Sequence, residues 1–265
     1  MLQNNNTNLG GQVLCVGGWD PSGLAGLAVD SRALHSLGIQ ALMLVSCNTW
    51  QNTSHWGGLK KTEIKVLDNN LQALKSEFQW QACKVGMLVD VEQVEWLTYQ
   101  WKKNTLPLMV YDPVLGASAG GHTLKYDMKN AIINTLLPHV HLLTPNLIEL
   151  AYFTDCEVKE VSDMEFAAKK MIQMGVKNIF IKGGHLDKDI KVDYFYNGET
   201  GFYLESQYSG PGARGTGCAL ASLIAGELAR GVLLDDAVRL AHTGVQIALA
   251  KASQVGCFDA RYLNF

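Results

Sequence analysis

The sequence has only six cysteines in 265 residues, and none forms a CxxC pair or stands at metal-ligand spacing from a histidine. This excludes a regular zinc-binding pattern, and the scattered positions indicate reduced thiols rather than a disulfide framework. No apolar run reaches the roughly 20 residues that a membrane-spanning helix needs. We also find no signal-peptide pattern before the first predicted strand. We therefore expect a cytoplasmic protein with no membrane partner.

Two common nucleotide-binding motifs are also absent. The sequence has no GxxxxGK[ST], which excludes a P-loop, and no GxGxxG follows the first predicted strand, which disfavours a dinucleotide-binding fold. The formal net charge of −3 is small and gives no indication of a nucleic-acid partner. If the chain binds phosphates, it does so by another arrangement.

Composition and length indicate one globular domain. Apolar residues make up 48% of the chain and charged residues 18%, an ordinary balance for a protein with a sizeable core. Residues 1–12 are polar and Asn-rich, which predicts a loose N-terminal tail. We found no internal repeat or low-complexity linker, so we expect a single domain over 13–265.

Short apolar segments typical of strands alternate with segments of helical periodicity. Strands are predicted at 13–16, 42–46, 84–88, 106–111, 142–145 and 178–182, with an antiparallel hairpin at 192–197 and 201–206 that turns at Asn197-Gly198. Helices are predicted at 24–37, 67–78, 91–101, 146–153, 164–174, 219–230 and 235–252. This alternation predicts an α/β fold, a mostly parallel sheet with helices on both faces. Ligands bind at the carboxyl ends of the strands in such sheets, and polar or glycine clusters follow most of the predicted strands.

The segment Gly215-Thr216-Gly217-Cys218 is the strongest indication of chemistry. It leads into a helical pattern, and the N–H groups at a helix N-terminus attract anions. We expect these four residues to form an anion hole for a transferred phosphoryl group. The same field favours the Cys218 thiolate, which would serve as the base. The alternative is an ordinary glycine-rich connector with a packed cysteine.

Three charged residues at predicted strand or helix ends complete a phosphotransferase site. Lys182 would reach the nucleotide phosphates, and Asp112 and Glu149 would hold Mg²⁺ directly or through its waters. Each has a simpler explanation: Lys182 as a solvated strand end, Asp112 as a turn residue before Pro113, and Glu149 as charge compensation at a helix start. Asp30 is either exposed or faces the same rim. Trp19 and Trp50 flank the site and could stack on a flat ring.

In combination these segments resemble the hydroxymethylpyrimidine/phosphomethylpyrimidine kinases of thiamine biosynthesis, within the ribokinase-like superfamily. The resemblance covers residues 13–252 and rests on seven motifs in family order. They are Gly18-Trp19-Asp20-Pro21-Ser22-Gly23-Leu24-Ala25-Gly26, Gln51-Asn52-Thr53, Lys84-Val85-Gly86-Met87-Leu88, Asp112-Pro113-Val114, Thr144-Pro145-Asn146-Leu147-Ile148-Glu149, Ile181-Lys182-Gly183-Gly184-His185 and Gly215-Thr216-Gly217-Cys218.

The resemblance implies a three-layer α/β/α fold, a homodimer, and ATP- and Mg²⁺-dependent phosphorylation of 4-amino-5-hydroxymethyl-2-methylpyrimidine and of its monophosphate. It assigns the metal to Asp112 and Glu149 and the phosphates to Lys182 and Asn146. The implied pyrimidine pocket consists of Gly18, Ala25, Asp30, Gln51, Met87 and Val114.

The chain departs from the family pattern at three positions. Leu24 replaces a glycine, Ala28 replaces a glutamine, and Arg214 replaces a histidine before the anion loop. We expect Arg214 to add a permanent positive charge near the nucleotide phosphates. Two alternatives to the pyrimidine kinase stay open at this point: a pyridoxal kinase of the same superfamily and a catalytically silent pyrimidine-binding protein.

Overall fold

The computed structural model describes residues 10–103, 106–116, 126–184, 191–256 and 260–265. Most of the predicted tail (residues 1–9), His122, His185 and Cys257 lie outside these ranges. Gln12, the last residue of the predicted tail, already begins the first strand.

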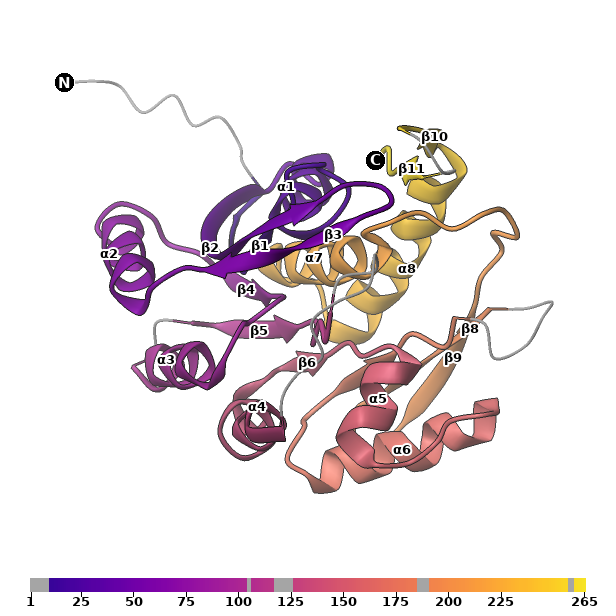
Figure 1. Cartoon of the computed structure of the whole chain (residues 1–265). Helices are drawn as coiled ribbons and strands as arrows, with labels where there is room; N and C mark the ends of the chain where they lie inside the picture. The colour runs from indigo at the N-terminus through magenta and orange to yellow at the C-terminus, as the bar shows by residue number, and fades with distance from the viewer. Residues whose placement is uncertain (1–9, 104–105, 117–125, 185–190, 257–259) are drawn as a thin grey trace.

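A nine-stranded sheet forms the centre of the described structure (Figure 1). Its strands are β1 (Gln12–Trp19), β2 (Gln40–Gln51), β3 (Trp56–Lys61), β4 (Ala82–Val85), β5 (Leu108–Tyr111), β6 (Leu142–Leu143), β7 (Ile179–Ile181), β8 (Val192–Tyr196) and β9 (Gly201–Glu205). Their order is β3-β2-β1-β4-β5-β6-β7-β8-β9. The six strands from β2 to β7 in this order are parallel, and the antiparallel β3, β8 and β9 lie at the edges. The predicted mostly parallel sheet and the predicted hairpin are confirmed.

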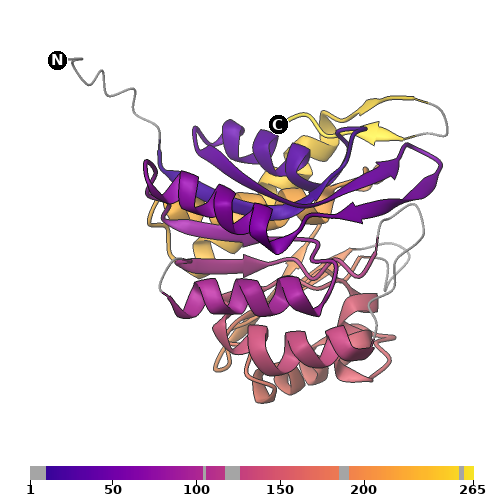
Figure 2. The same cartoon turned by 60° about the vertical axis from the view of Figure 1, so that its left-hand side comes forward.

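Helices cover both faces of the sheet, giving the expected three layers (Figure 1, Figure 2). One layer contains α1 (Gly26–Ser36), α7 (Thr216–Ala229) and α8 (Leu234–Ala250), and the other contains α2 (Ile64–Lys75), α3 (Val91–Lys102), α4 (Tyr126–Ala131), α5 (Leu147–Thr154) and α6 (Val161–Gln173). Alternate side chains of β1 enter the hydrophobic cores on the two faces of the sheet. Val13 and Cys15 pack on the side of α1, α7 and α8, and Leu14 and Val16 pack on the side of α2 to α6. Burial on both faces explains why β1 reads as a continuous apolar run. The remaining helices and strands are short: η1 (Ile132–Leu136), η2 (Leu137–His139), β10 (Ser253–Gln254) and β11 (Arg261–Tyr262).

The sequence did not predict the β2–β3 hairpin. Strand β2 continues to Gln51, where a loop was expected, and β3 pairs with it antiparallel. The β3 side chains are only partly buried or exposed, so they lack the apolar run that marks a buried strand. The turn of this hairpin lies beside the β10–β11 hairpin, where a Cβ on Gly256 would be 3.0 Å from Thr53 (Figure 2). This brings the Gln51 segment and the end of the chain to the same side of the molecule.

Candidate active site

A cavity of about 380 Å³ opens at the carboxyl ends of the central strands and at the N-terminus of α7. Fourteen of the fifteen predicted site residues line it, so the structure brings them together as the strand-end argument expected. They are Gly18, Ala25, Gln51, Met87, Asp112, Val114, Asn146, Glu149, Lys182, Arg214, Gly215, Thr216, Gly217 and Cys218. The remaining residue, Asp30, is a correction: it is fully buried and is not part of the cavity wall.

The backbone before α7 approaches α1 very closely. Gly215 has φ +79°, and a Cβ there would lie 2.4 Å from the carbonyl oxygen of Leu24. Only glycine fits this position, because both the left-handed backbone and the close approach exclude a side chain. Helix α7 begins at Thr216, three residues earlier than the periodicity predicted. Thr216, Gly217 and Cys218 therefore form its first turn, whose N–H groups have no partner within the helix.

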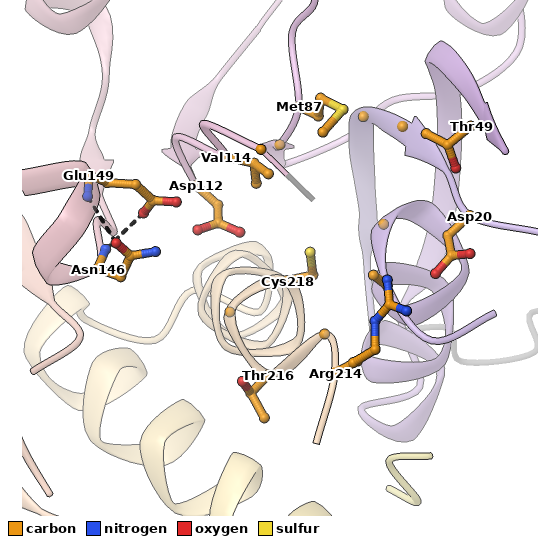
Figure 3. Close-up of a pocket in the computed structure, with 18 of the residues that line it drawn as sticks. Asp20, Thr49, Met87, Asp112, Val114, Asn146, Glu149, Arg214, Thr216 and Cys218 are labelled. Atoms are coloured by element: carbon orange, nitrogen blue, oxygen red, sulfur yellow. Dashed lines mark hydrogen bonds between the residues drawn. The ribbon is translucent and has the colours of Figure 1, made fainter. Parts of the chain in front are cut away.

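Charged side chains gather at one end of the cavity. The Lys182 ammonium, beyond β7, lies 2.6 Å from Asp112 at the end of β5 and 3.9 Å from Glu149. Asn146 and Glu149 form a capping box at the start of α5, in which each side chain binds the other's backbone N–H (Figure 3). Glu149 therefore has a structural role at the helix start, by capping in addition to the expected charge compensation, and it also lines the cavity.

Burial shapes the charges of this cluster. It raises the pKa of Glu149 to about 7, Asp112 adds to the effect, and Lys182 and the backbone N–H groups of Asn146 and Leu115 oppose it. Burial also opposes the charge on Lys182, but Asp112 and Glu149 outweigh it and raise the Lys182 pKa above its ordinary value. The cluster is therefore a lysine held charged between two carboxylates.

The donor set fits a nucleotide-borne magnesium ion better than a resident metal. Within the described ranges, no group of three or more His, Cys, Asp or Glu side chains could hold a metal by itself. Two carboxylates beside a phosphate site suit Mg²⁺, which usually takes one or two carboxylates together with phosphate oxygens and water. The space above α7 is open only because residue 217 is glycine: a Cβ there would be 3.1 Å from the Lys182 ammonium and 3.6 Å from Asp112. Asp112 and Glu149 would hold the ion, and Lys182 and the α7 N–H groups would face the phosphates.

Cys218 lies between the two ends of the cavity (Figure 3). Burial raises the pKa of its thiol to about 12, and Asp30 and Asp112 add to this. Lys84 and a hydrogen bond from the Gly26 N–H act in the other direction without overcoming it. This corrects the expectation of a thiolate: at neutral pH the Cys218 side chain is protonated, because desolvation outweighs the field of the helix N-terminus.

Arg214 lies at the other end of the cavity, away from Glu149 and Asn146 (Figure 3). Its guanidinium donates to the Gln51 side chain at 2.7 Å and to the Asn52 carbonyl oxygen at 2.5 Å. The structure therefore does not bring Arg214 to the phosphate end, where it was expected. Three further polar residues of the wall were given no role from the sequence: Asp20, Thr49 and Lys84. The signal for Asp20 was its place directly after β1.

The fold and the site together define a kinase-type phosphotransferase with a ribokinase-like fold that acts on a small molecule. A family model described as phosphomethylpyrimidine kinase matches residues 20–261, and the chain belongs to this family. The sequence is 29% identical to the hydroxymethylpyrimidine/phosphomethylpyrimidine kinase of Haemophilus influenzae over 92% of this chain and 93% of the relative.

Solved structures support the fold and the kinase class. The Bacillus subtilis pyridoxal kinase, crystallised as an ADP complex, has a TM-score of 0.87 and 25% identity, with 96% of both chains covered. The phosphomethylpyrimidine kinase of Clostridium difficile has a TM-score of 0.79 and 27% identity, with 90% of this chain and 99% of that chain covered. The predicted fold, family and enzyme class are confirmed, so the silent binding protein is no longer supported. No helix in the described part of the chain is long and apolar enough to cross a membrane.

Proposed function

We propose that the protein transfers the γ-phosphoryl group of ATP to the hydroxymethyl group of 4-amino-5-hydroxymethyl-2-methylpyrimidine, and then to the resulting monophosphate. The observation that carries this is the cavity itself: Lys182, Asp112 and Glu149 stand at one end, polar groups suited to a ring at the other, and the α7 N-terminus between them. The named relatives and the ADP complex of the B. subtilis kinase support the choice of substrate and nucleotide.

Each residue has a physical role in the proposed reaction. Lys182 neutralises the phosphates, and the N–H groups of residues 215–218 bind the charge that develops on the transferred group. Asp112 and Glu149 hold Mg²⁺, which supplies further neutralisation of phosphate charge. Cys218 first releases its thiol proton to solvent water, and the Lys84 ammonium lowers the cost of that ionisation. The thiolate then takes the proton of the attacking hydroxyl as the oxygen–phosphorus bond forms and ADP leaves. Asn146 fixes the backbone that carries Glu149.

Phosphorus NMR tests this function directly. The protein is incubated with the hydroxymethylpyrimidine, ATP and Mg²⁺, and the products are followed over time. We expect the monophosphate to appear first and the diphosphate later. ADP release without either product would contradict the proposal, and accumulation of the monophosphate alone would restrict it to the first step.

A pyridoxal kinase is the second candidate, because the B. subtilis pyridoxal kinase matches more of this chain, and with a higher TM-score, than the C. difficile pyrimidine kinase does. The ratio of kcat/KM for the hydroxymethylpyrimidine and for pyridoxal decides between them. A ratio above one favours the pyrimidine kinase, and a ratio below one favours the pyridoxal kinase.

We further propose, from the family resemblance, that the enzyme is a cytoplasmic homodimer. Multi-angle light scattering of the purified protein measures its mass directly. A mass close to twice the 29.0 kDa of one chain supports the dimer, and the mass of a single chain contradicts it.

A further inference from the structure

A chain of three hydrogen bonds runs along the ring end of the cavity. Arg214 Nη2 donates to Gln51 Oε1 at 2.7 Å, Gln51 Nε2 donates to Thr49 Oγ1 at 3.0 Å, and the Thr49 hydroxyl donates to the carbonyl oxygen of Trp19 at 2.9 Å. Arg214, Gln51 and Thr49 all line the cavity. These three hydrogen bonds therefore link the loop before α7 to the ends of β2 and β1.

The chemistry of the four groups determines which of them donates and which accepts in each hydrogen bond. The Trp19 carbonyl can only accept, so the Thr49 hydroxyl must donate to it and its oxygen is left to accept. The amide atom of Gln51 next to Thr49 must then be the NH₂ group. At the other end, the Arg214 guanidinium can only donate, so the amide atom that it meets must be the oxygen. Both ends of the chain require the same orientation of the Gln51 amide.

The Gln51 amide keeps one free position at each end. Its oxygen has two lone pairs and its NH₂ group has two hydrogens, and Arg214 and Thr49 each occupy one of them. The remaining lone pair and N–H match a ring edge that carries an amino group beside a ring nitrogen, in the way that glutamine pairs with adenine. A ring with a carbonyl oxygen beside a ring N–H presents the reverse pattern and would meet donor against donor and acceptor against acceptor.

We propose that Arg214 is a positioning residue that determines specificity: with Thr49, it holds the Gln51 amide in one orientation and so selects 4-aminopyrimidines over 4-oxopyrimidines. This role rests on the proposed function, since it requires that the ring end of the cavity receives a pyrimidine. Arg214 also holds the Asn52 carbonyl, which ties the end of β2 to the residue beside Gly215. Without Arg214, only the Thr49 contact opposes a half-turn of the Gln51 amide, so the reversed amide, which accepts the oxo ring pattern, becomes easier to reach.

The experiment compares two substrates in five forms of the full-length protein. The substrates are 5-hydroxymethyl-2-methylpyrimidines with an amino or an oxo group at position 4. The proteins are the wild type, Arg214→Met, Thr49→Val, and the matched variants Arg214→Lys and Thr49→Ser, which keep the donor or the hydroxyl. For each protein, the ratio of kcat/KM for the two substrates is measured, and ring binding without nucleotide is measured by calorimetry.

We expect the wild type to prefer the amino substrate by roughly 100-fold or more, because the oxo ring leaves buried polar groups mismatched. Arg214→Met and Thr49→Val should reduce this preference at least about tenfold, mainly through KM, whereas Arg214→Lys and Thr49→Ser should keep most of it. Calorimetry should show the same order for ring binding.

Two results would count against different claims. An unchanged preference in Arg214→Met and Thr49→Val would overturn the role of Arg214 while leaving the kinase function intact. A wild type that phosphorylates neither pyrimidine would instead contradict the proposed function. Near-UV circular dichroism of each variant confirms that an altered ratio does not come from unfolding.

Discussion

The ammonium of Lys84 lies 2.9 Å from the carboxylate of Asp30, and both side chains are enclosed, with 1% and 0% of their surfaces exposed. Ser222 donates a hydrogen bond to the same carboxylate at 2.8 Å. Burial disfavours the charge on Lys84, but Asp30 above all, together with Asp112, more than compensates and raises the Lys84 pKa. The pair joins β4, α1 and α7 beneath the cavity, where a Cβ on Gly86 would be 2.9 Å from the Lys84 ammonium.

Removing Lys84 should destabilise the protein strongly. In Lys84→Met the Asp30 carboxylate stays buried without its counter-charge, which typically costs about 3–5 kcal/mol of unfolding free energy. The double variant Lys84→Met, Asp30→Asn removes both charges and should recover much of that loss. Urea unfolding measures both values. Lys75→Met, at an exposed lysine, is the control and should change stability little; a Lys84→Met variant as stable as this control would contradict the importance of the pair.

Gly217→Ala should separate stability from activity. Residue 217 is in the first turn of α7 and its φ is not positive, so alanine costs the backbone nothing and improves helix propensity. Its Cβ would, however, stand 3.1 Å from the Lys182 ammonium, in the space where we propose that the transferred group lies. We expect an unchanged or slightly higher melting temperature and a kcat reduced by roughly 100-fold.

Gly212→Ala is the matched control for this effect, because a Cβ at residue 212 meets no atom within 4 Å and the backbone there has no positive φ. It should leave kcat near the wild-type value. Equal activity of the two alanine variants would show that the space above α7 is not used in the reaction.

The sequence predicted the position of the site better than its electrostatics. Strand ends in a parallel sheet must meet at one edge, and therefore Asp112, Lys182 and the Gly215 loop could be placed together from their order alone. The pKa of Cys218 could not be predicted from the sequence, because the helix field lowers it and desolvation raises it. The extent of desolvation is known only from the packed structure. Asp30 was misplaced for a related reason: its buried partner Lys84 is 54 residues away in the chain. Arg214 was assigned to the phosphates because its neighbours in the sequence are the anion-loop residues. Its hydrogen bond to Gln51 could not be predicted, because it depends on β2 continuing to Gln51, where a loop was expected.

The raised pKa of Cys218 predicts how the rate depends on pH. If the thiolate is the base, only its small ionised fraction is active, and that fraction rises tenfold for each pH unit below a pKa of about 12. We therefore expect kcat to increase steadily from pH 7 to pH 9 in the wild type. Cys218→Ala should lose both most of the rate and this slope, while nucleotide affinity, measured by calorimetry, stays close to normal.

A flat profile, or a Cys218→Ala variant with normal turnover, would remove the thiolate from the mechanism. In that event Asp112 is the carboxylate to test next, since it faces Cys218 across the cavity (Figure 3). Cys156→Ala serves as the control, because Cys156 is a partly buried thiol that does not line the cavity.

Asp193 should make stability depend on pH in an unusual direction. Its carboxylate on β8 accepts a hydrogen bond from the Gly183 N–H at 2.9 Å and lies 3.6 Å from His242. Burial raises the pKa of Asp193 from its ordinary value of 3.8 to about 6, against the smaller effects of Gly183 and Lys182, which lower it. Burial also lowers the pKa of His242, which weakens the positive charge that this ring can offer to the carboxylate.

The sign follows from proton linkage. Between about pH 4 and pH 6 the native state holds the Asp193 proton and the unfolded state does not, so raising the pH through this range removes stability. Two pKa units correspond to roughly 3 kcal/mol. Asp193→Asn lacks this titration, and its stability relative to the wild type should improve by about 2 kcal/mol between pH 4.5 and pH 8, as measured by urea unfolding, because about 1.5 pH units separate pH 4.5 from the Asp193 pKa of about 6. A wild-type and Asp193→Asn pair whose difference is the same at both pH values would show that Asp193 titrates normally in the folded protein.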